Sequence, residues 1–233
     1  MSETNTSGRR APAESESHRL GFDIIGGKPF EATVNTTPSQ IESVLIAGPP
    51  QTGKYELAVG SLGRNVDGAV FATNKYAAAR VKSDFADIPT EATTSHIHVV
   101  ESTTRDCSGP GRADPATVTT TGQNTTGVGV AITDAVEAVE TATDGRLGVG
   151  IDSLTHTLLN KEATELYQFT RAYVDLARTA DSIAIATVDT GIGCGEQTNA
   201  LRNYFDAVIE TRSTPERTYR ARTAAGTGDW VEF

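Results

Sequence analysis

Short, continuous apolar runs alternate with longer segments of helical periodicity through most of the chain. Five segments read as strands: residues 43–47, 68–73, 96–101, 146–152 and 183–188, of which 68–73 is a continuous apolar run. Continuous apolar runs are typical of strands that are covered on both faces, as in parallel sheets. Strands that alternate with helices along a chain connect most simply in that arrangement. The pattern therefore predicts an α/β fold with a mostly parallel central sheet flanked by helices.

Segments with apolar residues at helical spacing lie between these runs. They are residues 54–62, ending near Gly63, residues 76–85, stopping before Pro89, and about 128–141. A longer helix is predicted after residue 152, and its apolar stripe consists of Leu159, Leu166, Phe169, Tyr173 and Leu176. An apolar stripe marks the side of a helix that packs on its neighbours. These helices are expected to cover the sheet.

The ends of the chain and one internal segment depart from this alternation. Residues 1–20 have almost nothing to bury and are predicted to be a disordered polar tail. A Gly26-Gly27 turn between two apolar runs predicts a hairpin within residues 21–34. Residues 103–124, rich in Thr, Ser, Gly and Pro, are assigned no secondary structure. We expect one domain over residues 21–233.

The C-terminal part of the chain has no helical segment of its own. Three strand-like runs occupy residues 205–211, 217–222 and 230–233. Strands that follow one another without a helix pair most simply as antiparallel neighbours. Antiparallel strands are therefore expected at the C-terminal end of the sheet.

The most specific motif follows the first core strand. It reads Gly48-Pro49-Pro50-Gln51-Thr52-Gly53-Lys54-Tyr55 and matches the phosphate-binding loop G-x-x-x-x-G-K-[ST] in all but its last position. In such loops, backbone N–H groups at a helix N-terminus surround the phosphates and the lysine reaches the outer ones. A strand before the loop and a helix after it form the context that this motif requires. Residues Gly48 to Tyr55 are therefore predicted to bind ATP or another nucleoside triphosphate.

The last position of the motif bears on metal binding. The Ser or Thr hydroxyl that normally stands there holds Mg²⁺, and the ring of Tyr55 cannot place its oxygen at the same point. Asp152, at the end of the fourth apolar run, is the candidate metal ligand, because an acid at this place holds Mg²⁺ through water. The loop is thus expected to hold phosphate well and the metal poorly.

Composition restricts the partners. The formal net charge is −10, with 20 Lys and Arg against 30 Asp and Glu. Non-specific binding to nucleic acid or to an anionic membrane needs clustered basic residues, so both partners are disfavoured. The lysines are few: Lys28, Lys54, Lys75, Lys82 and Lys161. Low lysine with abundant acid, Thr and Ala resembles proteins of salt-accumulating archaea, in which molar salt screens surface repulsion.

Cysteine usage and hydropathy favour the cytoplasm. Cys107 and Cys194 lie far apart without a C-x-x-C partner, which favours two reduced thiols over a disulfide. No apolar stretch reaches the length of a spanning helix, and no secretory signal is found at the N-terminus. A cytoplasmic protein is expected.

Several weaker signals lie near the ends of strands. His96 and His98 alternate by two, but no third metal ligand is near them in sequence, so edge or surface histidines are expected. Thr187 and Asp189, at the end of the last core strand, are candidates to sense the outer phosphate. Residues 191–195 are predicted to form a mobile loop.

Taken together, Gly48 to Lys54, the strand at 69–73, the segment 147–156 and the β-rich end resemble the RecA superfamily. Within it, the chain is similar to the KaiC-like and RadA-like single-domain ATPases of archaea. Residues 126–137 resemble haloarchaeal KaiC-like proteins of unassigned function. The resemblance covers about residues 38–233. It implies an ATP-binding core, assembly as rings or filaments with nucleotide between subunits, and a catalytic glutamate just after the second strand.

The glutamate that the resemblance implies is missing from this sequence. The second strand ends Ala72-Thr73-Asn74-Lys75-Tyr76, without a carboxylate. Asn74 could orient a water but cannot accept its proton. Glu101, after the third strand, is an alternative base.

Three hypotheses follow. The first is a nucleotide-binding regulatory or interaction module with weak or no hydrolysis, which works as a homo-oligomer or with a protein partner. The second is an active Mg²⁺-dependent ATPase of recombination or clock type that uses an unrecognised base or one from a neighbouring subunit. The third is a scaffold with a vestigial loop, in which Tyr55 fills the phosphate site.

Overall fold

The computed structural model describes residues 24–25, 28–29, 41–88, 96–103, 118–122, 124–180, 182–191 and 195–233. The predicted disorder of residues 1–20 lies outside these residues. So do both cysteines and most of the loop predicted at 191–195. Of the predicted hairpin, strands β1 (Ile24–Ile25) and β2 (Lys28–Pro29) are described, and they pair antiparallel with Ile24 opposite Pro29.

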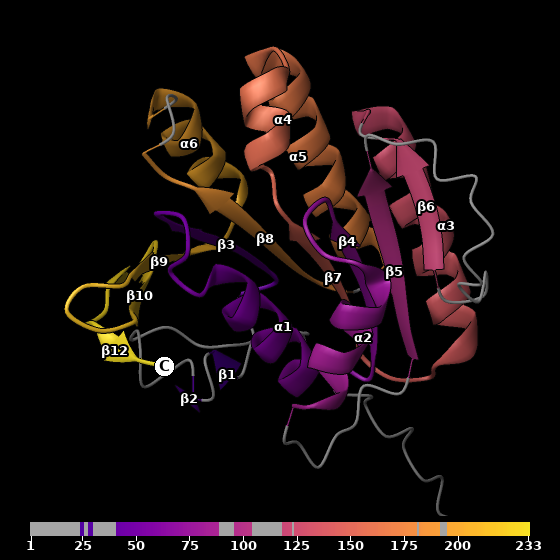
Figure 1. Cartoon of the computed structure of the whole chain (residues 1–233), viewed down its shortest axis with the longest axis horizontal. Helices are drawn as coiled ribbons and strands as arrows, with labels where there is room; N and C mark the ends of the chain where they lie inside the picture. Colours follow the sequence, from indigo (N-terminus) through magenta and orange to yellow (C-terminus); the bar gives the residue numbers. More distant parts are fainter. Residues whose placement is uncertain are drawn as a thin grey trace, which may run out of the picture.

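The core of the molecule is one 10-stranded sheet with the order β11-β10-β9-β3-β8-β7-β4-β5-β6, in which β12 also pairs with β10 (Figure 1). Its strands are β3 (Ser43–Gly48), β4 (Gly68–Thr73), β5 (His96–Thr103), β6 (Val118–Gly122), β7 (Leu147–Asp152), β8 (Ile183–Asp189), β9 (Ala207–Arg212), β10 (Thr218–Thr223), β11 (Gly226–Thr227) and β12 (Val231–Glu232). The strands from β9 to β6 in this order run parallel, and β10, β11 and β12 form antiparallel pairs. The predicted fold class is confirmed.

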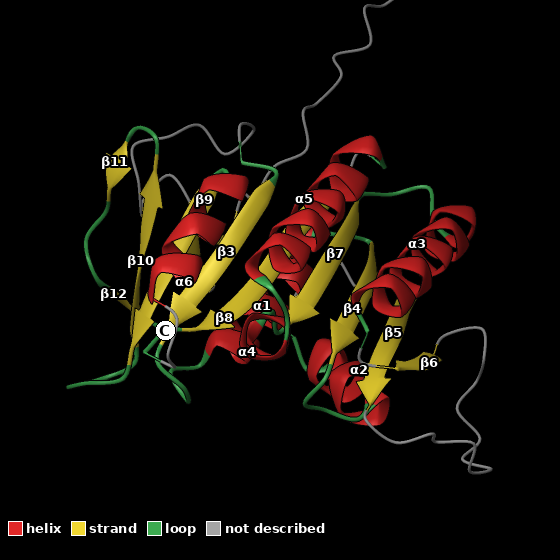
Figure 2. Cartoon of the chain, turned by 90° about the horizontal axis from the view of Figure 1, so that it is seen from above, coloured by secondary structure: helices red, strands yellow, loops and turns green. Residues whose placement is uncertain are grey.

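Helices cover both faces of this sheet (Figure 2). On one face lie α1 (Lys54–Asn65) and α2 (Ala78–Ala86); on the other lie α3 (Thr125–Ala142), α4 (Thr155–Asn160), α5 (Ala163–Thr179) and α6 (Gly195–Leu201). Successive residues of a strand face opposite sides, so Val44 and Ile46 pack beneath α1 while Leu45 and Ala47 pack beneath the second helical layer. Each core strand must therefore be apolar throughout. None of the helices in the described part of the chain has the length and apolar character needed to span a bilayer.

The segment without predicted structure contains a strand. β5 continues to Thr103, and β6 (Val118–Gly122) pairs with it in parallel at the edge of the sheet. The sequence Val-Thr-Thr-Thr-Gly carries little apolar signal because an edge strand is only partly covered. α3 then begins at Thr125, three residues before the predicted start, because the Asn124 side chain caps it by accepting a hydrogen bond from the Gly127 N–H at 2.6 Å.

Two helix predictions also need correction. α1 continues through Gly63 to Asn65, and a Cβ on Gly63 would lie 2.2 Å from Cδ1 of Ile88, so the glycine makes room for that side chain. The long helix after Asp152 is divided into α4 and α5. Leu159, at the end of α4, is 49% exposed and does not belong to the stripe, whereas Leu166 and Tyr173 on α5 are buried. A break in the helix changes which side of each part faces the sheet.

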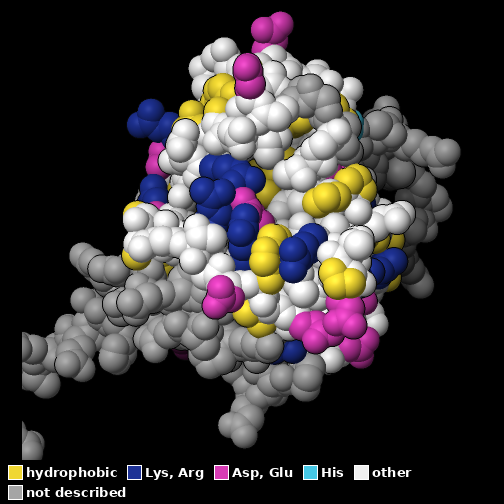
Figure 3. Space-filling view, turned by 90° about the vertical axis from the view of Figure 1, so that its left-hand side faces the viewer, with side chains coloured by type: hydrophobic (Ala, Val, Ile, Leu, Met, Phe, Trp, Pro, Cys, Tyr) yellow, Lys and Arg dark blue, Asp and Glu magenta, His cyan; other side chains and the backbone are white. Residues whose placement is uncertain are grey.

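An arginine cluster surrounds Glu210 on the C-terminal strands. Its carboxylate pairs with Arg202 at 2.8 Å, Arg220 at 2.6 Å and Arg222 at 3.1 Å. The Trp230 ring lies beneath the guanidinium groups of Arg212 and Arg220. Figure 3 shows Lys and Arg side chains gathered around acidic ones on this side of the molecule. Part of the basic charge in this acidic protein is thus concentrated at one end of the sheet.

The acid stability of the fold should depend on this cluster. Burial alone raises the pKa of Glu210, but hydrogen bonds from Arg202, Arg220 and Arg222 outweigh it and lower the pKa from 4.5 to about 2. Folding therefore favours the ionised form, and this contribution is complete above pH 4.5 and is lost as the pH falls toward 2. We expect Glu210→Gln to lose about 1–2 kcal/mol of unfolding free energy at pH 7 after allowance for solvent screening. In urea titrations, this difference from wild type should shrink below pH 4.5; a constant difference would contradict the assignment.

Candidate functional site

The phosphate-loop segment joins the end of β3 to the start of α1. Gln51 and Gly53 have positive φ, 62° and 81°. A side chain at Gly53 would be strained, and its Cβ would lie 2.8 Å from the ring of Phe233. α1 begins at Lys54, and no side chain caps it at Gly53. Because the first N–H groups of a helix have no partner within it, this turn offers donors to an anion.

Lys54 places its ammonium inside this turn. Its side chain is 5% exposed, and Nζ donates to the carbonyl oxygens of Gly48 at 3.0 Å and Pro49 at 2.5 Å. Nζ also lies 2.8 Å from Oδ1 of Asp189, at the end of β8. Burial lowers the pKa of Lys54, whereas the hydrogen bond and charge of Asp189 oppose this shift. These three acceptors within 3.0 Å match the three protons of an ammonium group, so the chain itself satisfies Lys54.

The side chain of Tyr55 points away from the turn. Its ring lies between α1 and α2, with its centroid 4.3 Å from that of Tyr76 and 5.9 Å from that of Phe71. Its hydroxyl donates to Oδ2 of Asp84 on α2 at 2.7 Å. Burial, and then Asp84, raise the pKa of Tyr55 and keep the hydroxyl protonated. The Tyr55 ring therefore lies outside the turn, and the hypothesis that it fills the phosphate site is wrong.

Asp152 ends β7 and is 1% exposed. Its Oδ1 accepts a hydrogen bond from the hydroxyl of Thr187 on β8 and lies 3.7 Å from Nζ of Lys75. Its Oδ2 is buried and has no hydrogen-bond partner among the described residues. Burial raises the pKa of Asp152, opposed first by the charge of Lys75. The carboxylate thus has one oxygen to offer to a ligand.

Lys75 connects the two carboxylates. It follows β4, and its Nζ lies 3.7 Å from Oδ1 of Asp152 and 3.7 Å from Oδ2 of Asp189. Lys54, Lys75, Asp152 and Asp189 therefore form a charge cluster of two cations and two anions at the carboxyl ends of β4, β7 and β8. Burial raises the pKa of Asp189, but the hydrogen bond and charge of Lys54 outweigh it and the pKa is lowered. The charged forms of Lys54 and Asp189 therefore stabilise each other.

The structure brings together more than the sequence predicted. Lys54, Asp152, Thr187 and Asp189 were separate candidates, and all four meet beside the loop. In the sequence, Lys75 stands out only as part of the segment after the second strand that lacks a carboxylate. Lys75 lies close to Asp152 because the parallel register places Thr73 opposite Asp152. Knowledge of the strand order would therefore have been enough to predict this proximity.

Asn74, considered for orienting a water, and Glu101, the alternative base, are both hydrogen-bonded to the backbone. The side-chain amide of Asn74 donates to the carbonyl oxygen of Ser153 at 3.1 Å, and its backbone N–H donates to the carbonyl oxygen of Asp152. Glu101 accepts a hydrogen bond from the backbone N–H of Ala78, in the first turn of α2. Its carboxylate therefore stabilises the start of α2, one strand further from Asp152.

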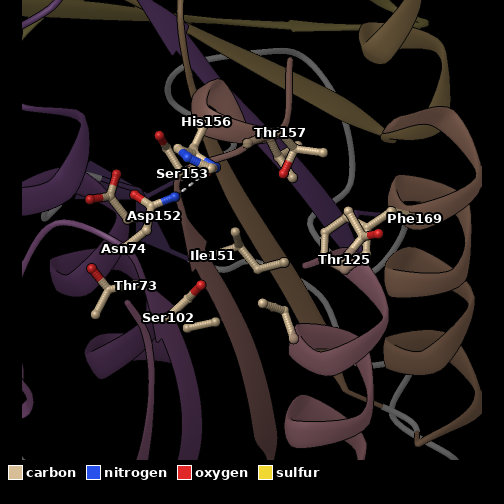
Figure 4. Close-up of a pocket in the computed structure, with 13 residues that line it drawn as sticks. Thr73, Asn74, Ser102, Thr125, Ile151, Asp152, Ser153, His156, Thr157 and Phe169 are labelled. Carbon is tan, nitrogen blue, oxygen red and sulfur yellow. Dashed lines mark hydrogen bonds between the residues drawn. The ribbon is translucent and has the colours of Figure 1, made fainter. Parts of the chain in front are cut away.

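A cavity lies on the other side of Asp152, beneath α3, α4 and α5 (Figure 4). Asn74, Asp152 and Ser153 line its polar side, and Ile151 and Phe169 contribute apolar surface. The Ser153 hydroxyl is buried without a hydrogen-bond partner among the described residues. The volume is about 30 Å³, enough for one water molecule. The cavity is too small for a nucleotide, and the turn from Gly48 to Lys54 stays the candidate ligand site that the sequence predicts.

The two histidines of β5 have different surroundings. His96 is exposed, while His98 is buried with Nε2 2.8 Å from Oγ1 of Thr119. The expectation of a surface position is wrong for His98, because the unpredicted strand β6 covers it. Within the described ranges, no group of three or more His, Cys, Asp or Glu side chains is arranged to hold a metal ion.

The residues around the turn suit a phosphate better than a divalent cation. The uncapped start of α1, the two positive-φ residues and Lys54 suit a phosphate. They do not suit a divalent cation, because Tyr55 is engaged with Asp84 and the Lys75 ammonium lies beside Asp152. We therefore assign no metal-dependent step to this site.

Comparison with known proteins identifies the family of the chain and a solved structure with a similar fold. The sequence profile of the Family of unknown function (DUF7504) matches residues 42–211. The chain belongs to this family. No curated protein matches its sequence. Among solved structures, it is similar to the KaiC-like protein PH0186 from the hyperthermophilic archaeon Pyrococcus horikoshii OT3, with a TM-score of 0.52 and 15% identity over 91% of this chain and 92% of the other. The resemblance expected from the sequence is confirmed at the level of a KaiC-like and RecA-like fold.

Proposed function

We propose that this member of the family is a nucleoside-triphosphate-binding module of RecA/KaiC-like type with weak or no hydrolysis, comprising one domain over residues 21–233. The observation that carries the proposal is the turn from Gly48 to Lys54. Its backbone enters α1 with no side-chain cap, and its lysine lies at the carboxyl ends of parallel strands. Ligands of open α/β sheets bind at that edge. ATP is the candidate ligand.

Weak hydrolysis follows from the groups that surround this turn. Asn74 cannot accept a proton, Glu101 is bound to the start of α2, and the Tyr55 hydroxyl is held by Asp84. The loss of one preorganised electrostatic group costs an enzyme about 3–4 kcal/mol of transition-state stabilisation. A module that binds nucleotide without rapid turnover is suited to regulation, either as a homo-oligomer or with a protein partner. The low lysine and high acid content supports an origin in a salt-accumulating archaeon.

The proposal is tested by titrating the full chain with ATP at high salt and measuring heat and melting temperature. ATP at 100 times its Kd should stabilise the fold by about 2.7 kcal/mol. Lys54→Ala should weaken binding at least tenfold, since it removes the charge in the turn. Lys161→Ala is the matched control, because this lysine lies at the turn between α4 and α5 and pairs there with Glu165.

Three results would change the conclusion. An ATP affinity that is the same in wild type and Lys54→Ala would contradict binding at this turn. If no nucleoside triphosphate stabilises the fold, the scaffold hypothesis would be favoured. In that case the ion pair with Asp189 would keep Lys54 from binding phosphate. Steady Mg²⁺-dependent phosphate release that disappears in Asp152→Asn would favour the active ATPase.

A further inference from the structure

Lys75 and Lys54 differ in how many of their protons the chain already uses. Lys54 has three close acceptors: Gly48, Pro49 and Asp189. The Lys75 ammonium lies 3.7 Å from each of its two carboxylates, which is longer than a hydrogen bond. Its side chain is 37% exposed. Lys75 is therefore the cation of the charge cluster that has donors left for a ligand.

The backbone holds Lys75 in this position. The hydroxyl of Thr73, the last residue of β4, accepts hydrogen bonds from the N–H groups of Lys75 at 3.1 Å and of Tyr76 at 3.2 Å. β4 is in turn paired with β7, with Thr73 opposite Asp152. The turn after β4 thus presents Lys75 to Asp152 by local hydrogen bonds. The backbone N–H of Asn74, which donates to the carbonyl oxygen of Asp152 at 3.1 Å, ties the same turn to β7.

The charges of the cluster already balance. Two ammonium groups and two carboxylates have a formal sum of zero. A divalent cation that bound Asp152 would raise this sum to about +2 and would meet the Lys75 ammonium beside the same oxygen. A phosphate group, by contrast, would find a cation facing it on the exposed side of the cluster.

We propose that the Lys75 ammonium takes the place of the divalent cation, bridging Asp152 and Asp189 on one side and phosphate oxygens on the other, so that the nucleotide binds without metal. This inference rests on the proposed function, since it concerns the same turn. The Lys75 ammonium would then neutralise part of the phosphate charge, as a bound cation otherwise does. The nucleotide affinity should then be nearly independent of Mg²⁺.

The test measures ATP binding to the full chain by calorimetry at constant ionic strength, once with EDTA and once with Mg²⁺. Wild-type affinities should agree within about threefold. Lys75→Ala should bind at least tenfold more weakly in EDTA and regain affinity when Mg²⁺ is added. Lys75→Arg, which keeps the charge, should retain binding in EDTA, and Lys161→Ala should behave as wild type.

A second measurement needs no nucleotide. Free Mn²⁺, followed by electron paramagnetic resonance, should bind Lys75→Ala at least tenfold more tightly than wild type, because Asp152 and Asp189 then lack their shared cation. Equal Mn²⁺ affinities would overturn the inference. So would ATP binding by wild type only when Mg²⁺ is present, although the proposed function would stand. Absence of ATP binding under both conditions, with Lys75→Ala still gaining Mn²⁺ affinity, would remove the proposed function and the phosphate role of Lys75 together.

Discussion

Asp189→Asn should lower the free energy of unfolding by about 3 kcal/mol, although it removes only one charge. Asp189 is buried and accepts from Nζ of Lys54 at 2.8 Å. Without the carboxylate, the Lys54 ammonium keeps two carbonyl acceptors but loses its nearest counter-charge within a site where it is 5% exposed. Removing one partner of a buried pair leaves the desolvation cost of the other. Urea unfolding at pH 7 measures the loss.

A double-mutant cycle with Lys54→Met identifies the origin of this loss. If the two groups stabilise each other, the double variant should be less destabilised than the sum of the single variants, with a coupling of about 2 kcal/mol. Asp175→Asn provides the control, because the Arg171–Asp175 pair is largely exposed and should contribute less than about 0.5 kcal/mol. Additive effects of the two buried substitutions would show that Lys54 and Asp189 do not form the pair described above.

Tyr55→Ser, which restores the residue that the phosphate-loop pattern requires, should lower the free energy of unfolding by about 4 kcal/mol. The Tyr55 ring is buried between Phe71 and Tyr76 in the layer of α1 and α2. Its removal leaves a cavity and deprives Asp84 of a donor at 2.7 Å. Restoring the motif residue should therefore destabilise the fold. Chemical denaturation followed by circular dichroism measures the loss of unfolding free energy.

Tyr55→Phe separates packing from hydrogen bonding. This variant keeps the ring and loses the hydroxyl, so we expect a loss of about 1–2 kcal/mol. ATP binding should be unchanged in Tyr55→Phe, because the side chain points toward α2 and away from the turn. A loss of ATP binding in this variant would show that the hydroxyl acts at the phosphate site. A cost in Tyr55→Ser no larger than in Tyr55→Phe would show that the ring contributes little.

Tyr55 and Lys75 stand at the two places where the sequence departs from the expected nucleotide site. At the position of the metal-binding hydroxyl, the chain has a ring that joins α1 to α2; at the end of β4, it has a lysine that faces Asp152. Both side chains have a definite place in the structure, since the Tyr55 hydroxyl donates to Asp84 and the Lys75 ammonium lies between Asp152 and Asp189. The proposal that nucleotide binds here without metal rests on both positions.

The apolar pattern was sufficient for the strands of the sheet that are covered on both faces. A strand covered on both faces must be apolar throughout, and the prediction of residues 68–73 coincides with β4 (Gly68–Thr73). The same reasoning failed at β6, whose Thr-rich edge strand has only partial cover and therefore no strong signal. It also failed at Leu159, because a break between α4 and α5 changes the exposed side without changing the spacing of apolar residues.

The sequence by itself determined the α/β class, the strand, turn and helix around Gly48 to Lys54 and the absence of a carboxylate after β4, because these depend on local residue types and spacing. Only the tertiary structure decided that Tyr55 turns toward Asp84, that Lys54 pairs with Asp189 and that Lys75 stands between two carboxylates. Those contacts join residues from strands and helices far apart in the chain. Their partners are set by the order of strands in the sheet and by the packing of helices on it, which no local pattern encodes.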